Sequence, residues 1–285
     1  MNNRQRITLT RLVTGTILLF LTLRLAEHAM LSALQSPPLF AVELDFTYWL
    51  FRASGIPAWI VQHRAVAILF DISLFSSGML SFLLPLNRKI LAVFALLLFI
   101  YAMTFNLYAT HHLAQVYGLM VVMLPFLVGN NDKFTLAWEG MRYFTCFIYF
   151  MAFIWKTCIG NSFYYLQQGA STFKNNLVDY MSLNPGSGMT NFYEWFLRHE
   201  WVLNAGEKGL VLLEGIMVAD FFTKKYDRWL IWVPVAIHVT TYFFSDVFFI
   251  ELLVVDLSFL SVSQLDLLGK MFSGLYRPEK QKKAI

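Results

Sequence analysis

The chain has 285 residues, of which 58% are hydrophobic and only 14% are charged. A soluble domain carries about 25% charged residues, and the deficit extends along the whole chain, so the composition excludes a sizeable soluble domain. The net charge of +4 comes from short basic clusters between apolar runs, which is the positive-inside pattern and not a nucleic-acid footprint. Because these runs are continuous and about 20 residues long, they favour an all-α bundle in lipid over a β-barrel.

Eight transmembrane helices are predicted from the apolar runs. They cover residues 12–34, 63–86, 90–108, 113–128, 138–160, 208–222, 229–245 and 247–262. Three arginines before residue 12 place the N-terminus in the cytoplasm, and an even number of spans returns the C-terminus there. Fifteen Lys and Arg then lie inside and five outside, and Arg24 and Lys156 within the membrane complete the 22 of the chain. We therefore predict a single transmembrane domain over residues 1–285.

The three longest segments outside the predicted spans have their own predicted structure. The segment that ends at Gln62 holds Trp49 and Trp59 among charged residues, which indicates an interfacial loop with a short amphipathic helix. Residues 161–206 form the longest such segment, and we place it on the outer side as two amphipathic helices that cap the bundle. Residues 266–285 are predicted to be a basic cytoplasmic tail.

Lys156 lies inside the apolar run of the fifth span, where an ammonium ion must be paired, reach water or lose its proton. The predicted topology brings other ionisable side chains to the same outer half of the bundle. These are Arg24, Glu27 and His28 on one face of the first span, the His111–His112 turn, Glu214, His238 and Glu251. We therefore expect a polar pocket near the outer face, with Asp71 and Asp256 near mid-depth and Asp220 towards the inside.

Structural roles remain open for the same residues. Lys156 can extend to the lipid headgroups, and Arg24 and Glu27 can form an ion pair within one helix. Glu214 can accept hydrogen bonds from a neighbouring helix, and the His111–His112 turn can lie at the membrane interface. A metal or haem site is not favoured, because adjacent histidines cannot place both rings on one helix face and the two cysteines lack zinc spacing.

Six short motifs occur in order along the chain. They are Arg11-Leu12-Val13, a histidine before Val116-Tyr117-Gly118-Leu119, Phe147-Ile148-Tyr149-Phe150-Met151-Ala152, Lys156, Leu213-Glu214-Gly215 and Ala236-Ile237-His238. In this order and spacing they resemble the membrane domain of vitamin K-dependent gamma-carboxylases, the HTTM family. The resemblance covers residues 8 to 265, with Trp155–Lys156 in place of the doubled lysine of the carboxylases.

The resemblance implies that Lys156 is the base that deprotonates reduced vitamin K, with His112 or His111 beside it and His238 lining the pocket. Glu214, Arg24, Glu27 and His28 are the other candidate substrate-binding residues. The implied cofactor is a quinol-type lipid, reduced vitamin K or menaquinol, with no metal, in a bacterial inner membrane. Burial in an apolar pocket disfavours an ammonium ion, and a neutral amine can act as a base.

Carboxylases of this family carry a large lumenal domain after the membrane part, whereas in this sequence the predicted basic tail follows the membrane part. A partner protein is therefore expected to supply the specificity, as the resemblance to membrane components of bacterial toxin-maturation systems also suggests.

Three functions follow as hypotheses. The first is a quinol-dependent, carboxylase-like membrane enzyme that modifies a peptide or small molecule at the outer face. The second is a non-catalytic membrane partner in peptide or toxin maturation or immunity, whose polar residues only hold helices together. The third is a small-molecule transporter, suggested by Asp71, Glu214 and Asp256, although no inverted repeat is visible. The expected partners are membrane lipid and a peptide or protein, and not a nucleic acid.

Overall fold

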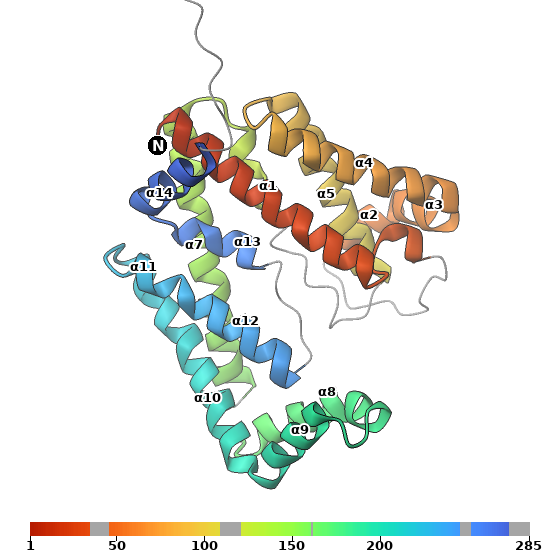
Figure 1. Cartoon of the computed structure of the whole chain (residues 1–285), viewed down its shortest axis with the longest axis vertical. Helices are drawn as coiled ribbons and strands as arrows, with labels where there is room; N and C mark the ends of the chain where they lie inside the picture. The colour runs from red at the N-terminus through yellow and green to blue at the C-terminus, as the bar shows by residue number, and fades with distance from the viewer. Residues whose placement is uncertain (35–45, 109–120, 161, 246–251, 274–285) are drawn as a thin grey trace, which may run out of the picture. The chain divides into compact units, whose positions relative to one another are not determined.

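A computed structural model describes residues 1–34, 46–108, 121–160, 162–245 and 252–273 (Figure 1). Every regular element in these ranges is a helix, so the all-α prediction is confirmed there. The longer helices are α1 (Asn3–Ala26), α4 (Arg64–Leu83), α5 (Arg88–Tyr108), α7 (Asn131–Ile154), α8 (Gln168–Leu183), α10 (Glu200–Ile216) and α12 (Trp232–Ser245). The shorter helices are α2 (Phe46–Ala53), α3 (Ile56–Gln62), α9 (Gly188–Arg198), α11 (Asp227–Leu230), α13 (Leu252–Asp256) and α14 (Val262–Ser273).

Three helical segments are long and apolar enough to cross a membrane: Asn3–Ala33, Arg64–Leu83 and Arg88–Tyr108. The bent pair Leu252–Phe259 and Val262–Met271 adds a fourth if it counts as one span. The described residues therefore contain fewer candidate spans than the eight predicted. The remaining predicted spans fall on helices that are shorter or more polar, or partly on residues outside the described ranges.

The helix boundaries correct several predictions. The second and third predicted spans match α4 and α5, but α1 ends at Ala26, before the predicted end at residue 34. α10 begins at Glu200, inside the segment predicted as an outer loop. The fourth predicted span, 113–128, lies partly outside the described residues. Among its described residues after residue 121, only the 3₁₀ turn Leu124–Leu127 is helical.

Two segments predicted not to span the membrane contain helices. The segment 161–206 contains α8, α9 and the start of α10, and its place on the outer side of the bundle stays a prediction. In the predicted tail, the residues up to Ser273 belong to α14, which packs against α1, and Gln5 Nε2 donates a hydrogen bond to Asp266 Oδ1 at 3.0 Å.

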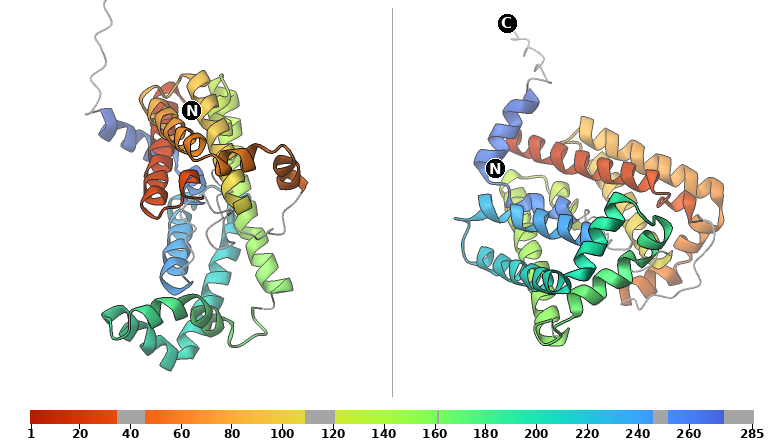
Figure 2. Two further views of the ribbon diagram at one scale, coloured as in Figure 1. Left: turned by 90° about the vertical axis from the view of Figure 1, so that its right-hand side faces the viewer. Right: turned by 60° about the horizontal axis from the view of Figure 1, so that its bottom comes forward.

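The first compact unit contains the described residues of 1–139 and 260–285. In it α1 packs against α4 and α14, and α4 packs against α5 (Figures 1 and 2). α1 begins at a capping box, in which the Asn2 and Gln5 side chains bond to each other's backbone amides. Four fully buried residues recur along one face of this helix: Leu9, Val13, Ile17 and Leu21.

Close packing in this unit depends on Gly78 of α4. A Cβ atom at this position would lie 2.8 Å from Leu18 of α1 and 2.9 Å from Phe94 of α5. Small residues allow membrane helices to approach closely, and Gly78 allows α4 to lie between two neighbours.

The second compact unit contains residues 140–259, and it holds helices α8 to α13 together with the C-terminal part of α7. α10 packs against α8 and α12, and α8 packs against α12 (Figure 2). α8 and α10 come so close at Gly169 that a Cβ atom there would collide with the backbone oxygen of Leu203. Two groups of buried residues form its core, one around Tyr149, Met217 and Ile237 and the other around Phe173 and Tyr193.

Candidate functional site

Lys156 lies where the regular helix α7 is interrupted. The helix continues as a π-helical turn at Trp155–Ile159, and the Gly160 amide donates to the Trp155 carbonyl oxygen at 2.7 Å. π turns are rare and occur frequently at functional sites. The lysine therefore stands on a local irregularity of the backbone and not in the middle of a uniform helix.

Lys156 forms an ion pair with Glu214 of α10. Lys156 Nζ lies 2.5 Å from Glu214 Oε1, and the two side chains are 33% and 6% exposed. The other carboxylate oxygen of Glu214, Oε2, is buried and has no hydrogen-bond partner in the described part of the chain. The pair thus offers one open acceptor inside the protein and an amine that can be reached from outside it.

A second carboxyl group, Glu207, lies two helical turns before Glu214 on the same face of α10. Burial raises the pKa of Glu207 above its ordinary value of 4.5, while the positive charge of Lys156 opposes this rise. Lys156 therefore interacts with two carboxyl groups, one in direct contact and one at longer range.

Three buried polar residues from different helices meet near this pair, and we call them the Tyr149 cluster (Tyr149, His238 and Asp256). The Tyr149 hydroxyl lies 2.9 Å from His238 Nε2 and donates to Asp256, whose two oxygens both lie at 3.2 Å. His238 Nε2 lies 3.5 Å from Asp256 Oδ2. The cluster joins α7, α12 and α13, and all three residues are at most 5% exposed.

The ion pair and the Tyr149 cluster belong to one polar region of the second unit. The charge of Glu214 acts on both Tyr149 and His238. Leu210, one helical turn before Glu214, packs against the apolar core around Tyr149. A change of charge at Glu214 would therefore change the electrostatic potential at Tyr149 and His238.

Three predicted site residues, Lys156, Glu214 and His238, lie in this region. His238, predicted to line the pocket, contacts Tyr149 and Asp256 through its Nε2. His111 and His112, the predicted partners of Lys156, lie outside the described residues, as does Glu251. Their role stays a prediction.

The other predicted site residues, Arg24, Glu27 and His28, belong to the first unit. They do not share one helix face as predicted, because α1 ends at Ala26 and His28 has a positive φ of 56°. Arg24 is buried, with its guanidinium carbon 5.0 Å from the centre of the Phe105 ring. Glu27 and His28 are exposed, so the three side chains differ in environment.

Sequence reasoning did not single out Tyr149 or Glu207, and it treated Asp256 only as a carboxylate near mid-depth that could serve a transporter. A carboxylate in an apolar helix needs a partner, and this requirement could have pointed to a hydroxyl or imidazole next to Asp256. Within the described ranges, no group of three or more His, Cys, Asp or Glu side chains is arranged to hold a metal ion.

Fold and site together define a helical protein with three helices long and apolar enough to cross a membrane and with a buried cluster of ionisable groups. Comparisons with protein-family models, curated proteins and solved structures find no match for this chain. The resemblance to the gamma-carboxylases therefore rests on the six sequence motifs alone.

Proposed function

We propose that the chain is an eight-span protein of a bacterial inner membrane, with both termini in the cytoplasm, that uses Lys156 as a base towards a quinol-type lipid. The reaction would be of the vitamin K-dependent gamma-carboxylase type and would modify a peptide or small molecule at the outer face. The observation that carries the proposal is the 2.5 Å contact between Lys156 and the buried Glu214.

Glu214 can make Lys156 a base by accepting its proton. The amine and the carboxylate share a hydrogen bond, so one proton transfer converts the ion pair into a neutral amine and a neutral carboxylic acid. Burial of Glu214 favours that conversion, because a carboxylate removed from water carries a desolvation penalty. The neutral Lys156 amine can then take a proton from a hydroxyl group, while Glu214 holds the first proton.

Two features of the site fit a quinol. A third of the Lys156 side chain is exposed, so a hydroxyl group can approach the amine, and Glu214 Oε2 is an open hydrogen-bond acceptor with no partner among the described residues. A reduced quinol supplies, when bound, the hydroxyl proton and the electrons that reduce dioxygen. We propose His112 or His111 as a further partner of Lys156, and His238 as a residue that stabilises the region through the Tyr149 cluster.

Epoxide formation tests this proposal. The purified protein in lipid nanodiscs is supplied with vitamin K hydroquinone or menaquinol and with oxygen, so that one dioxygen converts one hydroquinone into epoxide and water. Lys156→Met should lower the rate by about 100-fold or more, which is the contribution expected of a general base. Failure of the wild type to form epoxide with either quinol, or an equal rate with Lys156→Met, would refute the proposal.

A matched control comes from the ion pair of Lys174 with Glu200. These side chains are also 2.5 Å apart, but the lysine is 52% exposed, and Lys174→Met should leave the rate unchanged. Glu214→Gln keeps the shape of the acceptor and removes its capacity to take a full proton, so it should lower the rate with Lys156 intact.

The same contacts favour a second function. The Lys156–Glu214 pair joins α7 to α10, and the Tyr149 cluster joins α7, α12 and α13. A non-catalytic partner in peptide or toxin maturation or immunity would use these contacts only to hold its helices together. In that case, the wild type would form no epoxide, and the folded double variant Lys156→Leu/Glu214→Leu would not differ from it.

A further inference from the structure

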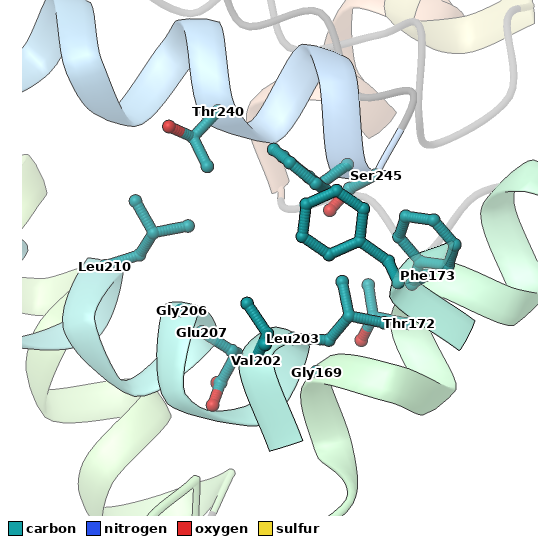
Figure 3. Close-up of a pocket in the computed structure, with 12 residues that line it drawn as sticks. Gly169, Thr172, Phe173, Val202, Leu203, Gly206, Glu207, Leu210, Thr240 and Ser245 are labelled. Carbon is teal, nitrogen blue, oxygen red and sulfur yellow. The ribbon is translucent and has the colours of Figure 1, made fainter. Parts of the chain in front are cut away.

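An apolar cavity of about 160 Å³ lies in the second unit between α8, α9, α10 and α12 (Figure 3). Its apolar side chains are Phe173, Phe196, Phe244, Val202, Leu203 and Leu210. In Figure 3, Leu210 extends from α10 towards α12, whereas the carboxyl group of Glu207 points to the opposite side. The interior of the cavity is therefore mainly hydrocarbon.

Hydrogen bonds between the surrounding helices keep this cavity in place. They join α8 to α10 (Ala170 amide to Asn204 Oδ1, 3.0 Å), α8 to α12 (Asn176 Nδ2 to the Ser245 carbonyl oxygen, 2.5 Å) and α9 to α12 (Tyr193 hydroxyl to the Phe243 carbonyl oxygen, 3.0 Å). At Gly169 the backbones of α8 and α10 are so close that only a residue without a side chain fits between them. The helices cannot close over the space without breaking these contacts.

The size and lining of the cavity select its ligand. Its volume is similar to that of an apolar cavity of about 150 Å³ that stays dry and binds benzene. Atoms that line an empty cavity lack dispersion contacts, and hydrocarbon restores them without leaving a polar group unpaired. A slender apolar chain fits these conditions, whereas a charged or strongly polar molecule does not.

We infer that the cavity binds a hydrocarbon chain, the acyl or isoprenoid chain of a lipid. Three helices of the described chain are long and apolar enough to cross a membrane, and lipid chains are the apolar molecules that surround a protein there. Glu207 contributes to the cavity wall, and its carboxyl group interacts with the charge of Lys156. A bound chain would thus lie next to α10, the helix that carries Glu214, the partner of Lys156. The inference concerns binding alone and does not depend on Lys156 acting as a base.

Photocrosslinking of the full chain in phosphatidylcholine nanodiscs tests this site. The probes are palmitic acid and farnesol, each carrying a diazirine near the end of its chain, and labelled residues are mapped by mass spectrometry. We expect saturable labelling of α8, α10 and α12 at cavity-lining residues, with competition by the unlabelled compound. Stronger competition by palmitic acid assigns an acyl chain, and stronger competition by farnesol assigns an isoprenoid chain.

Two glycines of α10 give a matched pair of variants. A Cβ atom at either Gly206 or Gly209 would meet no heavy atom within 4 Å, but only Gly206 lines the cavity. Gly206→Leu should therefore reduce cavity labelling at least tenfold, while Gly209→Leu, with the same gain in helix propensity, should label like the wild type. Thr240→Phe fills the cavity from α12 and should cause the same loss.

Labelling that is unsaturable, or that is spread over other helices, overturns the inference. Equal labelling of the wild type, Gly206→Leu and Thr240→Phe also overturns it. Because the assay involves no turnover, absence of epoxide formation in the other experiment leaves this outcome unaffected.

Discussion

Replacing Arg142 with methionine should destabilise the second unit by about 3–5 kcal/mol, because it leaves two carboxylates of a buried ion-pair network without their cation. Arg142 Nη2 lies 2.9 Å from Asp227 Oδ1 and donates to the Thr223 carbonyl oxygen at 3.1 Å, and Nε donates to Asp227 Oδ2 at 3.3 Å. Nη2 also lies 3.6 Å from Asp220, and the side chains of Arg142 and Asp220 are 3% and 0% exposed.

The magnitude follows from the groups that the methionine would leave behind. Neither oxygen of Asp220 has a hydrogen-bond partner among the described residues, so Arg142 is the nearest compensating charge for this carboxyl group. Methionine fills much of the volume of the arginine stem, which keeps the cavity contribution small. Asp227→Asn preserves the shape and part of the hydrogen bonding, and it should cost only about 1–3 kcal/mol.

Unfolding in detergent micelles, followed by far-ultraviolet circular dichroism, measures these free energies. The control is Arg198→Met, which breaks an exposed pair of Arg198 with Glu194 and should change the free energy of unfolding by no more than about 1 kcal/mol. The triple variant Arg142→Met/Asp220→Leu/Asp227→Leu should recover much of the loss, because apolar residues can replace a whole buried network. A loss for Arg142→Met as small as that of the control would refute the reasoning.

Three further predictions concern the second unit. Gly169→Ala should lower the free energy of unfolding by about 1–3 kcal/mol, because its methyl group collides with the backbone of α10. Gly209→Ala, whose methyl group meets no heavy atom within 4 Å, should raise the free energy of unfolding by up to about 1 kcal/mol. Thermal unfolding in which both variants shift the stability in the same direction contradicts this prediction. Tyr149→Phe should cost about 1.5–3 kcal/mol, since it removes the hydroxyl that donates to the buried aspartate of the Tyr149 cluster, and an unchanged unfolding transition would count against that bond. Burial raises the pKa of Glu207 above 4.5, so the folded state binds the carboxyl proton of Glu207 more tightly than the unfolded state does. The wild type should therefore lose stability relative to Glu207→Gln as the pH rises above about 4.5. A stability difference between the two proteins that is constant with pH would disprove this prediction.

The sequence predicts some helices well and others poorly, for a physical reason. α4 and α5 are continuous apolar runs, and their positions follow from length and hydropathy alone. Arg142, by contrast, lies at the start of the fifth predicted span and is one of the basic residues that the predicted topology counts on the cytoplasmic side. The structure buries it against Asp227, an aspartate 85 residues further along the chain. Hydropathy reports how polar a residue is, but it does not report a partner that neutralises it.

The Lys156 region shows the same limit at the candidate site. The cost of a charge in an apolar helix correctly marks Lys156 and Glu214 as residues that need partners, but 58 residues separate them and no spacing rule joins them. The family resemblance predicts an imidazole beside the lysine from His111 or His112, which lie outside the described residues; within them, the partner of Lys156 is a carboxylate. An opposite charge compensates an ammonium ion more strongly than a neutral ring does. Under the proposed function the pairing also matters for the chemistry, since a carboxylate can both hold the lysine proton and return it.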